Sequence, residues 1–210
     1  MDLNKPIEKH KGVNLPHWQQ REASISVTFR LADSLPAPVV ERLAAERRQL
    51  ERELAMMGCL PGDNEYRRLE QLQSQKFEEL LDRCQGECVL KSDKIAQCVS
   101  DALLFFDQQR YQMYAFCIMP NHVHSLFSMS EGVRLEEIVH SWKSFTAKRV
   151  NVILGRTGTL WQSDYYDRLI RGQQDFASSV RYIVDNPVVA GLRNWKWVYL
   201  APSLVAEFKT

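Results

Sequence analysis

Two histidines separated by one residue, in the segment MPNHVH at residues 119–124, have the side-chain type and spacing that could hold a metal ion. Residues two apart on a β-strand point to the same face, so His122 and His124 would direct two imidazoles at one ion. Two protein ligands form half of a divalent-metal site and leave coordination positions open for a substrate. The alternative is a pair of surface histidines that bind nothing.

A second constellation lies near the C-terminus, in the segment SVRYIVDNP at residues 179–187. Tyr182 and Asn186 are four residues apart and would share one face of a helix, where the carboxamide could give a neutral oxygen ligand. A phenol has a pKa of about 10, so it attacks at neutral pH only with help, such as a metal ion that polarises a phosphate. The alternative is a tyrosine in the core and an asparagine that ends the helix.

Several cationic and aromatic side chains follow the histidine pair in the chain. Cations of this kind bind phosphate and position a nucleic acid, whereas aromatic rings stack on unpaired bases. We expect DNA contacts from Lys143, Arg168, Arg171, Arg181 and Tyr166. Trp142 and Trp161 could also stack on bases, with core packing as the competing interpretation, and Tyr165 and Tyr166 compete with Tyr182 as nucleophile.

The periodicity of apolar residues predicts the elements that must position these side chains. Alternation predicts strands, and helical spacing predicts helices that end at Gly155 and before Pro187. The expected strands are 24–31, 111–119 and 122–129, with an extended run at 160–170, and the expected helices are 92–108, 135–154 and 175–185. Residues 1–22 are expected to form a loosely held arm. This order predicts an α+β fold, an antiparallel sheet with helices on one face.

The region from about 37 to 88 interrupts this pattern with two charged helical stretches, 39–57 and 65–83. It reads as a helical hairpin inserted into a single domain that spans residues 1–210. Residues 37–90 carry 8 Lys/Arg and 11 Asp/Glu, a net charge of −3, whereas residues 91–210 carry 14 and 11, a net charge of +3. The mildly basic part suits an anionic partner. The hairpin is either a solvated extension or an arm that binds DNA or a partner.

Bulk composition excludes several classes of protein. The hydrophobic content of 45% and the charged content of 25% are ordinary for a globular chain. The five cysteines include no C-x-x-C pair, so neither a disulfide framework nor a zinc ribbon is indicated, and a cytoplasmic location is expected. No apolar run approaches the ~20 residues that span a bilayer.

Taken together, these motifs resemble those of the HUH endonuclease superfamily, and most closely its REP-associated tyrosine transposases, relatives of the small insertion-sequence transposases with one catalytic tyrosine. The resemblance covers residues 24–36 and about 90–200. It is carried by MPNHVH and by VTFRL at 27–31, HSWKSFT at 140–146, WQ at 161–162, DRLIR at 167–171 and YIVDNPVVAGL at 182–192.

The resemblance implies a ferredoxin-like sheet with the histidine pair on a central strand. It implies that His122 and His124 bind Mg²⁺ or Mn²⁺, with Asn186 as a third ligand, and that Tyr182 forms a 5′-phosphotyrosine with single-stranded DNA beside a hairpin, such as a REP-like repeat. The protein would be nucleoid-associated, as a monomer or a homodimer. Two other functions remain: a protein of this fold that binds hairpin DNA or RNA without cutting, and a phosphohydrolase that uses water and leaves no adduct.

Overall fold

The computed structural model describes residues 8–11, 16–19, 24–58, 76 and 79–208. The chain divides into two compact units, Met1–Ala32 with Cys88–Thr210, and Asp33–Glu87. The first unit contains the strands β1 (Glu8–Lys11), β2 (Pro16–Gln19), β3 (Ser24–Arg30), β4 (Tyr111–Ile118), β5 (His122–Met129), β6 (Tyr166–Leu169) and β7 (Val198–Leu200). Its helices are α3 (Asp93–Leu104), α4 (Leu135–Leu154), α5 (Gly172–Val189) and α6 (Val205–Phe208), with short 3-10 turns at Val89–Lys91 and Pro202–Leu204.

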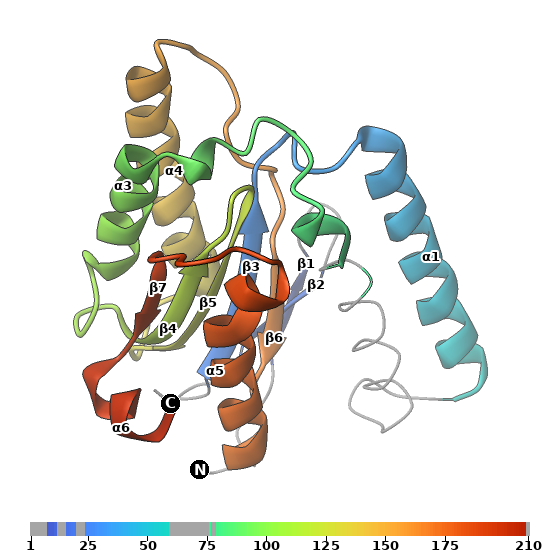
Figure 1. Cartoon of the computed structure of the whole chain (residues 1–210). Coiled ribbons are helices and arrows are strands. Elements are labelled where there is room, and N and C mark those ends of the chain that lie inside the picture. The colour runs from blue at the N-terminus through green and yellow to red at the C-terminus, as the bar shows by residue number, and fades with distance from the viewer. Residues whose placement is uncertain (1–7, 12–15, 20–23, 59–75, 77–78, 209–210) are drawn as a thin grey trace. The chain divides into compact units, whose positions relative to one another are not determined.

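A five-stranded sheet with the order β6-β3-β5-β4-β7 forms the centre of this unit (Figure 1). Every neighbouring pair in it is antiparallel. The predicted α+β fold class is therefore confirmed, and β5, the strand that carries the histidine pair, lies in the middle. A strand in this position has its backbone groups bonded on both sides, which holds its side chains in a fixed register.

Helices cover both faces of the sheet, because side chains alternate along each strand. Val123 and Phe127 of β5 pack with residues of α3 and α4, including Val99 and Trp142. Leu126 points to the other face and packs with residues of α5, including Val180 and Ile183. The sequence predicted helices on one face only. This holds for α3 and α4, but α5 covers the opposite face. The physical reason is that the second face also carries apolar side chains, Leu126 of β5 with Ala115 and Cys117 of β4, which need a cover.

The end of α4 agrees with the prediction, and the bounds of α5 and β6 differ from it. Helix α4 ends at Gly155, which has a φ of 63°. Helix α5, in contrast, continues through the buried Pro187 to Val189. A proline removes only one helical donor, and here the loss falls in the last turn, where the helix is already ending. The extended run predicted at 160–170 forms strand β6 only over Tyr166–Leu169, preceded by a bridge between Leu31 and Trp161.

The predicted N-terminal arm contains an antiparallel pair, β1 with β2. In the second unit, α1 (Ala37–Met56) matches the first helix of the predicted hairpin. Most of the predicted second helix lies outside the described residues. Within its described part, residues 79–82 are helical. Within this unit Glu87 N–H donates to Asp33 Oδ2 at 2.8 Å. In the described part of the chain, no helix is both long and apolar enough to cross a membrane.

A series of buried hydrogen bonds links α3, β4 and α4 on the α3–α4 face. Trp142 Nε1 donates to the hydroxyl of Tyr111 at 2.9 Å, and this hydroxyl donates to the carbonyl of Leu103, also at 2.9 Å. Trp142 and Trp161 are both buried and both contact Phe29. The interpretation of these two tryptophans as core residues therefore fits the structure, and neither presents a ring face to solvent.

We predict that Tyr111→Phe lowers the free energy of unfolding by about 2 kcal/mol, because it leaves the Trp142 N–H and the Leu103 carbonyl without their partner. Urea denaturation followed by tryptophan fluorescence measures the change. Tyr114→Phe is the matched control: it removes a half-buried hydroxyl that shares a 3.0 Å hydrogen bond with Ser128. Equal losses in the two variants would contradict the prediction.

Candidate metal and tyrosine site

The two histidines of β5 lie side by side and fully buried on the α5 face of the sheet. Their Nε2 atoms are 2.9 Å apart, and the rings meet edge to face with centroids 4.6 Å apart. The strand period of two produces this arrangement, as the spacing predicted.

Each histidine uses its other ring nitrogen to bind a neighbouring side chain. Nδ1 of His122 lies 2.7 Å from Oδ1 of Asn121, which can only accept, so this nitrogen carries the proton. Nδ1 of His124 lies 2.8 Å from the hydroxyl of Thr28, which can donate or accept. With both Nδ1 atoms engaged by neighbouring side chains, the Nε2 atoms face each other within hydrogen-bond distance, and a bound ion would replace that contact.

Burial keeps both imidazoles neutral. It lowers the pKa of His124 to about 3 and, together with the neighbouring ring, lowers the pKa of His122 well below its usual value. Neutral imidazole is the form that binds metal, so no proton has to be displaced from a cationic ring at neutral pH.

Helix α5 brings Tyr182 and Asn186 to the same place. The ring of Tyr182 meets the edge of His124 with centroids 5.3 Å apart, and the side chain is 39% exposed. Asn186 is 2% exposed, and its Oδ1 has no hydrogen-bond donor among the described residues. All four predicted residues thus lie on the same side of the sheet. Two of them come from β5 and two from α5.

These donors fit a divalent ion. The described residues contain no group of three His, Cys, Asp or Glu side chains able to hold a metal. The buried amide oxygen of Asn186 is an oxygen donor of a different type. Adjacent ligands at about 2.1 Å in an octahedral site are about 3 Å apart, close to the 2.9 Å between the Nε2 atoms.

The two competing tyrosines lie on opposite faces of β6. Tyr166 pairs directly with Thr28, which in turn pairs with His124, so these three residues share one face. Tyr165 packs in the other core, and burial with nearby carboxylates raises the pKa of its phenol. Tyr165 is thus a poor nucleophile by position and by pKa, whereas Tyr166 stays a neighbour of the site.

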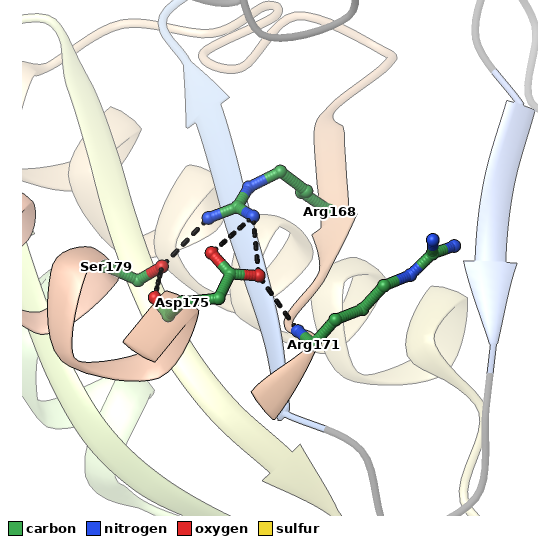
Figure 2. Close-up of polar contacts among 4 residues, drawn as sticks. All are labelled: Arg168, Arg171, Asp175 and Ser179. Atoms are coloured by element: carbon green, nitrogen blue, oxygen red, sulfur yellow. Dashed lines mark hydrogen bonds and ion pairs between the residues drawn. The ribbon is translucent and has the colours of Figure 1, made fainter. Parts of the chain in front are cut away.

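The predicted DNA-binding cations are engaged to different degrees. Lys143 donates to the carbonyl of Ser163 at 2.7 Å, and burial lowers the pKa of its amine to about 8. The Arg181 guanidinium lies 5.9 Å from the Phe208 ring centroid. Arg168 is bonded to residues of α5, and the exposed side chain of Arg171 points away from them (Figure 2). Their contacts with DNA stay predictions.

Sequence reasoning missed a cation beside the histidines. Arg30 pairs directly with His122 across β3 and β5, which puts both side chains on the α5 face. It is buried, and burial lowers its pKa to about 10. The alternation of Ser26, Thr28 and Arg30 is visible in the sequence and marks one polar face of the strand, but only the strand register shows that this face meets the histidines.

Residues 90–186 match the model of the IS200-like transposase family. The matched segment contains both histidines, the tyrosine and the asparagine. The resemblance to single-tyrosine transposases, predicted from the motifs, is confirmed at this level.

Two curated proteins and one solved structure are similar to this chain. A Haemophilus influenzae protein assigned to the REP-associated tyrosine transposases is 25% identical over 114 residues, covering 46% of this chain and 63% of that protein. An uncharacterized protein of the same organism is 25% identical over 121 residues, covering 45% and 63%. The chain thus matches less than two thirds of these curated relatives. The solved structure of a REP-associated tyrosine transposase bound to a REP hairpin has the same fold, with a TM-score of 0.52 and 14% identity over 91% of this chain and 81% of that one.

We predict that Asn186→Leu raises the free energy of unfolding of the metal-free protein by about 1 kcal/mol, because it removes a buried acceptor that has no donor. Denaturation in the presence of EDTA measures the change. Asn121→Leu is the matched control and should destabilise by about 1–3 kcal/mol, because it removes an acceptor that His122 uses. A loss of stability in Asn186→Leu would mean that its amide oxygen is satisfied.

Proposed function

We propose that this protein is a metal-dependent endonuclease and strand transferase that cuts single-stranded DNA beside a hairpin through a 5′-phosphotyrosine on Tyr182. The observation that carries the proposal is the contact between the Tyr182 and His124 rings, with centroids 5.3 Å apart, with the donor-less oxygen of Asn186 one helical turn further along α5. Residues from distant parts of the sequence meet in this contact.

The residues have distinct roles in this reaction. His122, His124 and Asn186 would hold Mg²⁺ or Mn²⁺, and the bound ion supplies positive charge to a non-bridging oxygen of the scissile phosphate. The phenol of Tyr182 attacks phosphorus: it gives up its proton as a bond from its oxygen to phosphorus forms, the bond from phosphorus to the 3′ oxygen breaks, and the 3′ oxygen takes up a proton, so that none is gained or lost overall. The strand is left with a free 3′-hydroxyl and a 5′ end on the tyrosine.

The phosphotyrosine keeps the reaction reversible. The new ester retains the energy of the broken phosphodiester, so a 3′-hydroxyl that attacks it reseals a strand without ATP. A water molecule in the same position would release the end instead. Transfer rather than hydrolysis is therefore favoured where the strand end is held in place, as hairpin binding beside the cut would do.

The substrate class is inferred from the relatives. One related protein is assigned to the REP-associated tyrosine transposases, and a protein of the same fold has been solved with a REP hairpin. The net charge of +3 on residues 91–210, from 14 basic and 11 acidic residues, suits DNA. A monomer and a homodimer are both compatible with this chemistry.

The second candidate function is hairpin binding without cleavage. The buried, donor-less amide of Asn186 weighs against it, because an acceptor without a donor destabilises a protein that gains nothing from it. A protein that only bound DNA would be stabilised by an apolar residue at this position.

We predict a covalent adduct when the protein is incubated with Mn²⁺ and a hairpin oligonucleotide that carries a labelled single-stranded flank. The adduct should survive denaturation and appear as a shifted band in a denaturing gel. Tyr182→Phe should abolish it, because the nucleophilic oxygen is lost, while the affinity for the hairpin changes by less than about threefold.

Tyr166→Phe is the control, since Tyr166 shares the histidine face. An adduct that persists in Tyr182→Phe and is lost in Tyr166→Phe would move the nucleophile. Hairpin binding with no adduct in the unmodified protein would favour the second candidate function. Cleavage to free ends with no adduct would favour a phosphohydrolase.

We predict that Thr28→Val lowers the affinity for Mn²⁺ by about 10- to 100-fold, because the hydroxyl on Nδ1 of His124 is lost. Thr28→Ser should retain most of the affinity. Isothermal titration calorimetry measures the binding without DNA, and the rise in the unfolding midpoint on adding Mn²⁺ provides a second readout. Equal affinities in Thr28→Val and the unmodified protein would contradict the role of the hydroxyl.

A further inference from the structure

Arg168, Asp175 and Ser179 form a cluster of polar bonds, which we call the clamp, between strand β6 and the start of helix α5 (Figure 2). Nη1 of Arg168 donates to Oδ1 and Oδ2 of Asp175 at 2.8 and 2.9 Å. Nη2 of Arg168 donates to the Ser179 hydroxyl at 2.8 Å. One guanidinium thereby holds two successive turns of the helix.

The helix side of the clamp is itself tied together. The Ser179 hydroxyl donates to the backbone carbonyl of Asp175 at 2.8 Å. The Asp175 carboxylate also accepts the backbone N–H of Arg171 at 2.8 Å, which gives the exposed first turn an acceptor as a capping box does. A negative charge in the first turn of a helix is favourable, so Asp175 suits this position in the helix as well as its partner.

The clamp and the reacting residues lie on one stripe of α5. Asp175, Ser179, Tyr182 and Asn186 stand at positions i, i+4, i+7 and i+11 of the helix, which all fall on the same face. Tyr182 is two turns from Asp175, or about 10 Å along the axis. A bond network that fixes the rotation of the first two turns therefore fixes the direction in which Tyr182 points.

The edge strand supplies the other anchor. Arg168 pairs with Ser26 of β3, and Ser26 pairs with Leu126 of β5, two residues after His124. The clamp is thus attached to the same sheet register that presents the histidines. Arg168 is therefore connected to the histidine strand through paired strands alone, without a loop. The path of contacts from the proposed metal ligands to the proposed nucleophile is correspondingly short.

We propose that Arg168 is a positioning residue that holds α5 in the rotation that brings Tyr182 against His124, rather than a residue that contacts DNA. The proposal rests on the proposed function for the role of Tyr182. Two nitrogens of the Arg168 guanidinium bond to residues of α5, and a phosphate would have to compete with the Asp175 carboxylate for Nη1.

Because the Arg168–Asp175 ion pair is partly exposed, it should orient α5 more than it stabilises the fold. The Arg168 and Asp175 side chains are 42% and 27% exposed, and exposed ion pairs add little to the stability of a fold. A planar guanidinium with bonds to two residues nevertheless restricts orientation strongly, which a lysine ammonium in its place would not do. Loss of the clamp should therefore disturb α5 without unfolding the protein.

The first test needs no DNA. Hydrogen–deuterium exchange of the α5 amides is compared among the unmodified protein, Arg168→Gln and Asp175→Asn. Both single variants should exchange faster in α5 but not in α4, by about tenfold or more. Arg171→Gln is the matched control and should leave exchange in α5 unchanged, because only its backbone N–H joins the network.

The second test measures single-turnover formation of the Tyr182 adduct with the Mn²⁺ and hairpin substrate described above. Arg168→Gln and Asp175→Asn should slow the reaction by about 10- to 100-fold at saturating DNA, while the dissociation constant for the hairpin changes by less than about threefold.

The outcomes separate the clamp from the proposed function. Unchanged α5 exchange in both single variants overturns the clamp. So does a weaker hairpin affinity with a smaller salt dependence in Arg168→Gln alone, without an effect of Asp175→Asn, because that is the signature of a phosphate contact. Absence of an adduct in the unmodified protein overturns the proposed function, and the exchange data then decide the clamp by themselves.

Discussion

The structure depends on one constraint: two imidazoles two residues apart on the central strand must present their Nε2 atoms 2.9 Å from each other. The strand period supplies the direction, but a side chain on a strand still has freedom about its own bonds. The partners of the Nδ1 atoms remove that freedom. Asn121 comes from the turn before β5 and Thr28 comes from the neighbouring strand β3, so the pair is fixed only when the sheet has formed with the correct register.

The two faces of this sheet do different work. The α3–α4 face is a mostly apolar core with two chains of buried hydrogen bonds, one from Trp142 through Tyr111 and one from Trp161 through Thr146. The α5 face contains two buried neutral imidazoles, a buried guanidinium and an amide oxygen that has no donor among the described residues. Burying polar groups costs free energy. The apolar packing of the other face helps to offset that cost.

Local pattern was enough to predict much of this. Alternation located β3, β4 and β5, helical spacing located α3 and α4, and the spacing of His122 and His124 predicted that their side chains lie side by side. The errors arose where contacts between distant segments decide. The side of the sheet that α5 covers, the course of this helix through Pro187 and the position of Arg30 opposite His122 all depend on strand register. The Thr28–His124 bond joins residues 96 apart in sequence, and no local pattern specifies such a pairing.

Exposure within the site indicates how a substrate approaches. The proposed ligands His122, His124 and Asn186 are buried, whereas the side chain of the proposed nucleophile, Tyr182, is 39% exposed. A site for a small molecule would enclose it and bury the reacting group as well. An exposed nucleophile above buried ligands instead suits a long chain whose backbone crosses the surface and offers one phosphate at a time. The ring of Tyr182 needs a firm support to work from the rim, and the bonds between β6 and the first turns of α5 provide that support from inside the same fold.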